Sequence, residues 1–380
     1  MISLKGITWD HPRGYSPLNA SIQRYRELFG VEVSWEKRTL KDFGDISIHE
    51  LAKRYDLLVI DHPHMGSVHE SSCLVNLEEH LSKEDLYLFD ALSVGPSFQS
   101  YHYNNHLYAL PVDAACQTAA YRSDLIGDRL LPSSWADVIE LSNNLKAQNN
   151  WIAVALRATD CNCIFLTLCA QTGNPVAQNA ELLIPVDTGI YVLKLMKTLK
   201  NIAHPESLNW NPIQLYNYMT HADEVLYSPL AFAYINYAKD SPTPLRYTNI
   251  PGTKNAILGG AGMAVSAHSK CINEGIHYTR WICDPRYQET FYVEEGGQPA
   301  QLNAWTNEQA DKKAGGFFSS VLPVIKEAYV RPQWAFWPAF QEWMGEQIHQ
   351  YLRDDSDPAV LIDRLNEEYK KRIQQNGNSI

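Results

Sequence analysis

Acidic and histidine side chains follow two apolar segments of this chain, and they are the residues best suited to chemistry. Asp10-His11 comes directly after Ile7-Thr8-Trp9, and Asp61-His62 comes directly after Leu57-Leu58-Val59-Ile60. A carboxylate can accept two hydroxyl hydrogen bonds at once, and bonds to a charged acceptor are stronger than neutral ones. Each Asp could also cap a following helix. The pattern predicts that Asp10 and Asp61 bind hydroxyl groups of a polar ligand.

The same segments raise the question of a metal site. His62-Pro63-His64 offers two imidazoles, and His11 lies beside a carboxylate. Imidazole and carboxylate groups together bind transition metals, but the Cys161-Asn162-Cys163 pair has no partner pair at zinc-site spacing. We therefore expect His11 and His62 to hydrogen bond to a ligand or to a loop, and we predict neither a metal nor another cofactor.

A second group of candidates follows the extended segment Tyr108–Val112. Asp113 and Gln117 have side chains that bind hydroxyl groups, and we expect them to contact a ligand. Cys116 lies between them and has two interpretations. It is either a small buried residue or a nucleophile, because a thiolate is reactive where its surroundings stabilise it.

Aromatic and polar side chains in later segments complete the predicted ligand site. Sugars present C–H faces that stack on aromatic rings, while their hydroxyl groups bind polar groups. These further candidates are Trp9, Asp160, Tyr234, Asn236 and Trp337. The run Gly259-Gly260-Ala261-Gly262 lacks the Lys-Ser/Thr of a phosphate loop. Gly260 is therefore expected to allow a close backbone approach, either to the ligand or to the other half of the fold. Gln298 belongs to a second glycine-containing loop of this kind.

The elements that position these residues begin with a strand–helix–strand unit. Ile7–Trp9 and Tyr55–Ile60 have the apolar character of strands, and Leu18–Phe29 has helical spacing. This order predicts a parallel sheet, at whose carboxyl edge ligands bind. Ser133 or Ser134 is expected to cap a helix. The later expected elements are a strand at 151–156, a helix at 188–199, a strand at 257–265, and helices at 314–328, 337–352 and 358–374.

Composition limits the classes of function. The 380 residues fit about two domains, and 45% hydrophobic with 20% charged residues is usual for a globular chain. A net charge of −11 without a clustered basic stretch argues against a nucleic-acid partner. No apolar run approaches the length of a membrane span, so membrane insertion is not expected.

The start of the chain and its cysteines bear on location. A first strand follows Met1 almost at once, without the basic and apolar stretches of a secretory signal. Seven cysteines form no even framework, which suggests free thiols in a reducing compartment. The expected location is the cytoplasm, or the periplasm or extracellular space if a native signal has been removed.

Taken together, these segments resemble the extracellular solute-binding proteins of ABC sugar importers, the maltose-binding-protein-like group. The matching pieces keep the family's order from Gly6 to Pro332. They are Gly6–Gly14, Asp56–Pro63, Leu107–Gln117, Tyr121–Leu125, Pro132–Leu141, Ala233–Tyr237, Gly259–Ser266, Gly296–Ala300 and Arg331-Pro332.

The resemblance implies an α/β, two-lobed periplasmic-binding-protein fold (type II) with the ligand cleft between the lobes. One lobe would comprise residues 1–112 and 253–302, and the other residues 113–252 and 303–380. Such a monomer would close by hinge motion around a small sugar or polyol and deliver it to an ABC permease.

Three other functions stay open at this point. A cytoplasmic enzyme on the same fold could use Cys116, as enzymes of the thiaminase I type use a Cys near their lobe crossing. Those enzymes pair the thiol with a Glu, and no Glu occurs around 234–237. A ligand sensor is the second. Glycoside hydrolysis is the third, if Asp10, Asp61 and Asp113 converge.

Overall fold

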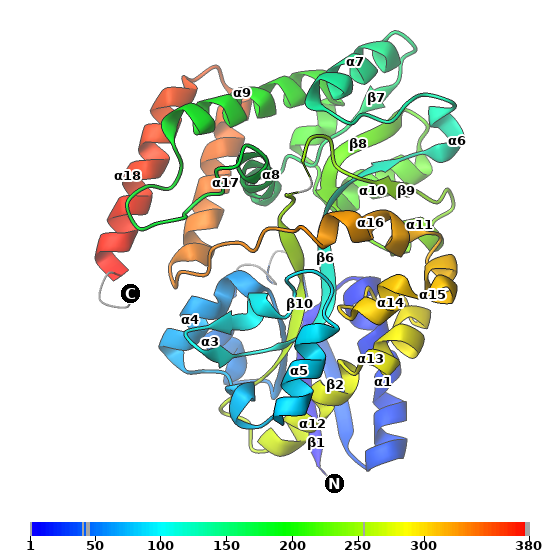
Figure 1. Cartoon of the computed structure of the whole chain (residues 1–380), viewed down its shortest axis with the longest axis vertical. Helices are drawn as coiled ribbons and strands as arrows, with labels where there is room; N and C mark the ends of the chain where they lie inside the picture. Colours follow the sequence, from blue (N-terminus) through cyan, green and yellow to red (C-terminus); the bar gives the residue numbers. More distant parts are fainter. Residues whose placement is uncertain (1, 40–41, 43–45, 254, 377–380) are drawn as a thin grey trace.

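The computed structural model describes residues 2–39, 42, 46–253 and 255–376, and their buried hydrophobic side chains form two clusters. One cluster takes residues 4–112, apart from Val94, together with 261–292. The other takes residues 114–258 and 293–373 with Val94. Figure 1 shows the two halves one below the other, with two long strands running between them. The chain therefore has two cores and a connecting region.

One mixed sheet of eight strands runs through both halves in the part of the chain that the structure describes. Its strand order is β2-β1-β3-β10-β6-β8-β7, and β9 pairs with β6. The strands are β1 (Ser3–Trp9), β2 (Glu32–Arg38), β3 (Leu57–Ile60), β6 (Leu110–Tyr121), β7 (Trp151–Ile152), β8 (Val225–Phe232), β9 (Arg246–Thr248) and β10 (Leu258–Val265). The short strands β4 (His102–Tyr103) and β5 (His106–Leu107) form a separate hairpin.

The helices cover each half separately. Those of the first half are α1 (Pro12–Phe29), α3 (Ile48–Ala52), α4 (Met65–Ser71), α5 (Lys83–Ala91), α12 (Ile272–Ile282) and α13 (Pro285–Tyr287). Those with side chains in the second core are α6 (Ser123–Ile126), α7 (Trp135–Lys146), α8 (Ala158–Gln171), α9 (Val186–Ile202), α10 (Pro212–His221), α11 (Asn236–Lys239), α14 (Leu302–Thr306), α15 (Glu308–Lys313), α16 (Phe317–Ile325), α17 (Trp337–Arg353) and α18 (Pro358–Asn376). Short 3-10 turns lie at His62–His64, Leu77–Glu79, Gln99–Tyr101 and Pro205–Leu208, and a π-helical turn at Gln288–Tyr292.

The predicted strand–helix–strand unit is present, with one difference that matters for the site. α1 begins at Pro12, because the Nδ1 atom of His11 accepts the N–H of Arg13 at 3.1 Å and Pro suits the first helical position. The helix ends at Gly30, which has the left-handed backbone typical of a helix C-cap. This early start places Arg13 in the first turn, beside the carboxyl end of β1.

The helices and strands predicted for the later part of the chain differ from the observed ones in length more than in type. Ser134 caps α7, and Asp137 completes the capping box. α16 starts at Phe317 and not at 314, because Gly315 and Gly316 have positive φ angles that a helix does not continue through. The edge strand β2 escaped prediction because its outward-facing residues are charged.

The connection between the halves depends on β6 and β10. All of β6 except its last residue is buried, and β10 lies antiparallel to it with a register shift between Ala261 and Gly262. Gly260 has φ +109, and a Cβ there would lie 2.3 Å from the carbonyl oxygen of Asp113. Only glycine allows this approach of the two strands. The segment that contains Gln298 also lies beside β6, since Ala114 N–H donates to Gln298 O at 3.2 Å.

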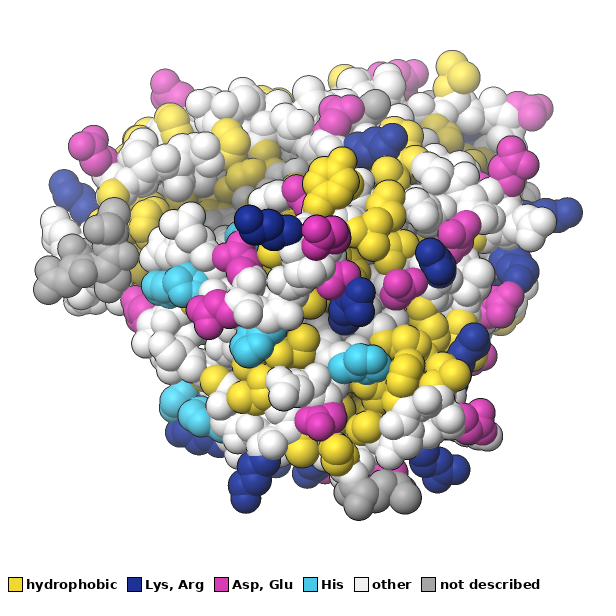
Figure 2. Space-filling view, turned by 60° about the horizontal axis from the view of Figure 1, so that its bottom comes forward, with side chains coloured by type: hydrophobic (Ala, Val, Ile, Leu, Met, Phe, Trp, Pro, Cys, Tyr) yellow, Lys and Arg dark blue, Asp and Glu magenta, His cyan; other side chains and the backbone are white. Residues whose placement is uncertain are grey.

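Surface charges of both signs are interspersed on the face that Figure 2 shows. None of the described helices combines the length and the apolar character needed to cross a membrane.

Candidate functional site

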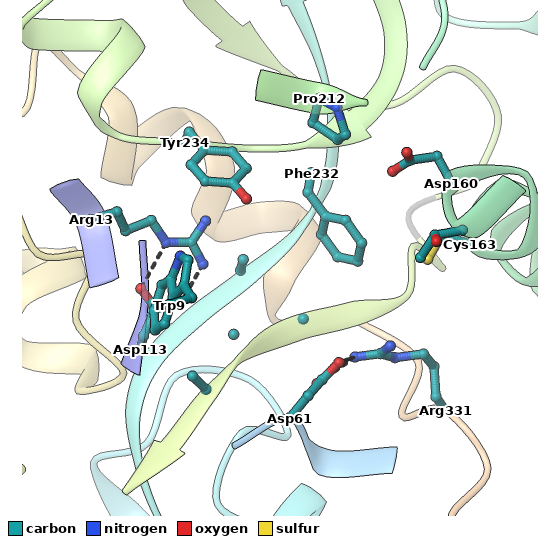
Figure 3. A pocket seen from close by; sticks show the side chains of 15 residues that line it. Trp9, Arg13, Asp61, Asp113, Asp160, Cys163, Pro212, Phe232, Tyr234 and Arg331 are labelled. Carbon is teal, nitrogen blue, oxygen red and sulfur yellow. Dashed lines mark hydrogen bonds and ion pairs between the residues drawn. The ribbon is translucent and has the colours of Figure 1, made fainter. Parts of the chain in front are cut away.

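A cavity of about 160 Å³ lies where the two halves meet (Figure 3). Its wall combines strand ends of the first half, the crossing strands, and a helix start and loops of the second half. The lining residues are Trp9, Arg13, Asp61, Asp113, Ala115, Thr159, Asp160, Cys163, Pro212, Phe232, Tyr234, Gly259, Gly260, Ala261 and Arg331. β1 and β3 are neighbours in the sheet and parallel, and both point their carboxyl ends at the cavity, as expected of a ligand site in a parallel sheet.

Arg13 and Asp113 form a buried ion pair in one wall. The guanidinium donates from Nε to Asp113 Oδ2 at 2.7 Å and from Nη2 to Oδ1, so the pair is bidentate. Nη1 donates to the carbonyl oxygen of Ala233 at 3.1 Å, which links α1 to the second half. Burial alone would lower the pKa of Arg13, but the charge and hydrogen bonds of Asp113 outweigh it and raise that pKa. Arg13 therefore stays charged.

Asp61 and Arg331 form a second ion pair between the halves. Nη2 of Arg331 donates to both carboxylate oxygens, at 2.6 and 2.8 Å, and the backbone N–H of His62 donates to Oδ1 at 2.9 Å. Burial would raise the pKa of Asp61, but the charge of Arg331 and the bond from His62 lower it. The segment that carries Arg331 also bonds to the first half through Gln333, which donates to His62 O at 3.2 Å.

Asp160 differs from the two paired aspartates. It lies in the first turn of α8, a helix whose residues 160–170 are all buried. No hydrogen bond or ion pair joins its carboxyl group to any other described residue. Burial raises its pKa to about 8, and the charge of Arg157 opposes this only in part. Its carboxyl group is therefore left without a partner among the described residues.

Aromatic side chains form the rest of the wall. Trp9 packs on Gly14, where a Cβ would lie 2.2 Å from the indole ring. Phe232 ends β8, and the bare backbone of Gly259 leaves room for its ring. The guanidinium carbon of Arg13 lies 4.6 Å from the centre of the Tyr234 ring, a favourable cation–π geometry. In Figure 3 the Tyr234 hydroxyl points into the cavity.

Six of the side chains or backbones predicted from sequence line the cavity: Trp9, Asp61, Asp113, Asp160, Tyr234 and Gly260. Asp10 does not. Its side chain is 58% exposed and forms an ion pair with Lys37 at 2.7 Å. The chain turns at the end of β1, where the N–H of Asp10 donates to Arg38 O of the edge strand, and this turn directs the side chain away from the cavity. Its neighbour His11, and not Asp10, caps α1.

The two predicted histidines lie behind the cavity wall. The ring of His11 packs edge-on against Tyr234 at 4.9 Å. Burial and the charge of Arg13 lower its pKa to about 4. His62 is fully buried, and burial with the charge of Arg331 lowers its pKa to about 4. Both rings are therefore neutral at pH 7 and support residues that line the cavity.

Four further candidates serve the frame of the site and do not line the cavity. Gln117 accepts the hydroxyl hydrogen of Thr167 at 2.6 Å. Gln298 accepts the N–H of Ile235 at 3.1 Å and donates to Ala114 O at 2.7 Å. Asn236 faces Gly296 O at 3.5 Å. Trp337 is fully buried in the second core, because the apolar stripe of α17 turns inward.

Cys116 also lies away from the cavity. β6 alternates its faces, so Asp113 and Ala115 line the cavity while Cys116 packs into the second core. Burial raises the pKa of its thiol, and the charge of Arg13 offsets this only slightly. A thiol that stays protonated and lies outside the cavity cannot attack a bound ligand.

Two arginines and Phe232 line the cavity although they were not among the residues predicted from sequence. Arg13 and Arg331 occur in the sequence argument only within segments that carry the family resemblance, yet they neutralise two of the three lining aspartates. Phe232 could have been noticed as the aromatic end of an apolar run after Val225. Among the described residues, no three His, Cys, Asp or Glu side chains gather to hold a metal ion.

Solved structures with the same fold are numerous. T. maritima MalE3 with bound maltose matches with a TM-score of 0.85 at 15% identity, over 97% of this chain and 99% of that one. A ribitol complex of an ABC transporter solute-binding protein from Agrobacterium radiobacter K84 gives 0.83 at 17%, over 97% and 98%. A tagatose complex from Thermotoga lettingae TMO gives 0.82 at 15%, over 98% and 99%.

These likenesses establish the fold. The chain has the two-lobed α/β periplasmic-binding-protein fold, with a cleft between its lobes, and the prediction from sequence is confirmed on this point. No protein-family model matches the sequence, and a search of curated proteins also finds no match. A shared fold does not by itself identify a ligand.

Proposed function

We propose that this protein reversibly binds a small hydroxyl-rich ligand, a sugar or a polyol, between its lobes and delivers it to an ABC-type importer. The observation that carries the proposal is the cavity at the meeting of the lobes, whose wall combines polar groups and aromatic rings. Structural neighbours of this chain hold maltose, ribitol and tagatose. An ABC permease is the partner that this function implies.

The chemistry of the wall suits such a ligand. Trp9 and Phe232 offer ring faces for C–H groups, while Asp160 and the Tyr234 hydroxyl offer hydrogen-bonding groups without partners among the described residues. A volume of about 160 Å³ is below the roughly 300–1,000 Å³ of sites for drug-sized ligands. In this degree of closure the cavity therefore suits a single sugar unit or a short polyol.

Binding would be coupled to closure of the lobes, which we take as residues 1–112 with 253–302 and residues 113–252 with 303–380. The bonds from Arg13 to Ala233 O and from Arg331 to Asp61 cross between them. These contacts form only when the lobes are close, so they favour the closed state and add to the contacts of the ligand.

A role in import also implies a location outside the cytoplasmic membrane. The cytoplasmic location that the unpaired cysteines suggested gains no support from the comparisons, which include ABC transporter solute-binding proteins. A location outside the cytoplasmic membrane is therefore part of what we propose for this protein.

Catalysis is the weaker alternative. Asp61 and Asp113 are each held by an arginine and Asp10 lies outside the cavity, so two free carboxyl groups for glycoside hydrolysis are not assembled there. Cys116 does not reach the cavity. A ligand sensor would use the same cavity and differ only in its partner.

The test is a thermal-shift screen of sugars and polyols, followed by calorimetry and by mass spectrometry of the recovered ligand. A ligand at one hundred times its Kd should stabilise the protein by about 2.7 kcal/mol and be recovered unchanged. Phe232→Ala should weaken binding, whereas Tyr87→Ala, at a ring that is 76% exposed and remote from the cavity, should not. Chemical conversion of the ligand, or no shift with any compound, would contradict the proposal.

A further inference from the structure

Two of the three carboxyl groups in the cavity wall are paired with an arginine, and the third is not. Arg13 pairs with Asp113 and Arg331 pairs with Asp61, so these four residues contribute no net charge. Asp160 is the remaining ionisable carboxyl group in the wall, and none of the described residues donates a hydrogen bond to it or forms an ion pair with it. A ligand that complements this wall must therefore supply the hydrogen-bond or ion-pair partner that Asp160 lacks.

The helix that carries Asp160 is held in place by close packing. The residue is only 9% exposed, and its helix α8 packs against α17 so closely that a Cβ on Gly345 would lie 2.3 Å from Ala158 O. Figure 3 shows its carboxyl group directed into the cavity, toward the space beside Pro212 and Phe232. The group is thus presented to whatever enters the cavity.

The charged groups around Asp160 are few. Arg157 precedes it by one turn and is exposed, so water screens most of its effect. Arg331 and Asp61 approach Cys163, one turn further along α8, but they cancel each other. Tyr234 also lines the cavity, and burial raises the pKa of its hydroxyl, so this group is neutral. None of these groups compensates a negative charge on Asp160.

A neutral ligand and a cationic ligand would meet this carboxyl group differently. A buried carboxylate without a cation is costly, so the group keeps its proton when the ligand carries only hydroxyl groups. An ammonium group would pair with the ionised form, and the face of Phe232 would add a cation–π contact. The wall therefore gains more from an ammonium group than from a hydroxyl group.

We propose that the ligand of this protein carries a protonated amine, which Asp160 binds, so that the ligand class is an amino sugar or an amino polyol. The inference rests on the proposed function and specifies the ligand of the same cavity. Asp160 is then the residue that determines specificity, while the paired Asp61 and Asp113 shape the wall.

Matched pairs of compounds test this directly by calorimetry. D-glucosamine is compared with D-glucose and with its uncharged amide N-acetyl-D-glucosamine, and 1-amino-1-deoxy-D-sorbitol is compared with D-sorbitol. The amine of at least one pair should bind about ten- to a hundredfold more tightly than its neutral partner, as expected for a hydrogen bond between charged groups. Asp160→Asn should remove this preference, and Asp128→Asn, an exposed acid in the same lobe, should keep it.

Proton release gives a second, independent readout. At pH 7 the empty site holds a mainly protonated Asp160, and pairing with an ammonium group drives that proton off. Titrations in buffers of different ionisation enthalpy should therefore show release of most of one proton on binding of an amine. The Asp160→Asn variant should release none, and neutral sugars should release none from either protein.

The outcomes separate the two proposals. Neutral members that bind as tightly as the amines, or an amine preference that survives in Asp160→Asn, would overturn this inference and leave the proposed function in place. Absence of binding by every member of a wider sugar, polyol and amine panel would overturn the proposed function, and this inference with it.

Discussion

Replacement of Arg13 by Met should destabilise the protein strongly, because it leaves Asp113 buried without a partner. The Asp113 side chain has no exposed surface, and its only hydrogen bonds among the described residues come from Arg13. Removing one member of such a pair costs about 3–5 kcal/mol. The carbonyl of Ala233 loses a donor as well, so we expect a value in the upper half of that range at pH 7.

The loss should depend on pH in a predictable direction. Burial already raises the pKa of Asp113 against the opposing charge of Arg13, and without Arg13 the pKa rises further. A carboxyl group with a raised pKa in the folded state costs nothing below its unfolded pKa of about 3.9 and costs more as the pH rises. Protonation of Asp113 over three pH units can change the free energy of unfolding by at most about 4 kcal/mol. The cost that remains at pH 4 is that of the lost hydrogen bonds, so the loss of stability there should fall to about 1–2 kcal/mol.

Urea unfolding followed by tryptophan fluorescence at pH 4 and pH 7 measures both values. The double variant Arg13→Met/Asp113→Asn should recover part of the loss at pH 7 and match the single variant at pH 4. Arg26→Met, on the exposed face of the same helix, should cost less than about 1 kcal/mol. A loss below about 1 kcal/mol at pH 7, or equal losses at both pH values, would refute this account of the ion pair.

Three further predictions concern single residues. Asp160→Asn should raise the melting temperature more at pH 8 than at pH 4.5, since a carboxyl group with a folded pKa of about 8 opposes folding increasingly over that interval; an equal shift at both pH values would contradict the buried carboxyl. Gly260→Ala should lower the free energy of unfolding by at least about 2 kcal/mol, because its φ and its closeness to β6 both exclude a side chain; Gly30→Ala, with open space around it, is the control at about 1 kcal/mol. Cys116→Ala should bind ligand normally, and in the native protein iodoacetamide should modify the partly exposed Cys271 before the buried Cys116; mass spectrometry of the peptides would reveal the reverse order.

Local patterns predicted those parts of the fold that local forces decide. β1 and β3 are short apolar runs that end in polar residues, and α7 has a complete capping box, so their types were readable. β2 was not, because an edge strand with alternating charged residues has the composition of a loop. The length of α16 depended on the backbone angles of Gly315 and Gly316, which composition does not reveal.

The site was less predictable than the fold, because its main contacts join distant parts of the chain. Arg13 and Asp113 are 100 residues apart, and Asp61 and Arg331 are 270 apart. Neither pairing leaves a local pattern. Trp337 illustrates the opposite error: an aromatic residue at a helix start suits a ligand site equally well as a core, and only packing decides between them.

The crossing strands also limit how the two lobes can move. β6 and β10 are hydrogen bonded to each other where they pass from one core to the other, so neither strand can slide along its neighbour without breaking that ladder. We expect bending at Gly260 and at the register shift beside it, where regular pairing is interrupted. Opening of the lobes should therefore be a rotation about a single axis. The distance between two spectroscopic labels, one on α5 and one on α9, should then take two values and show no continuous spread.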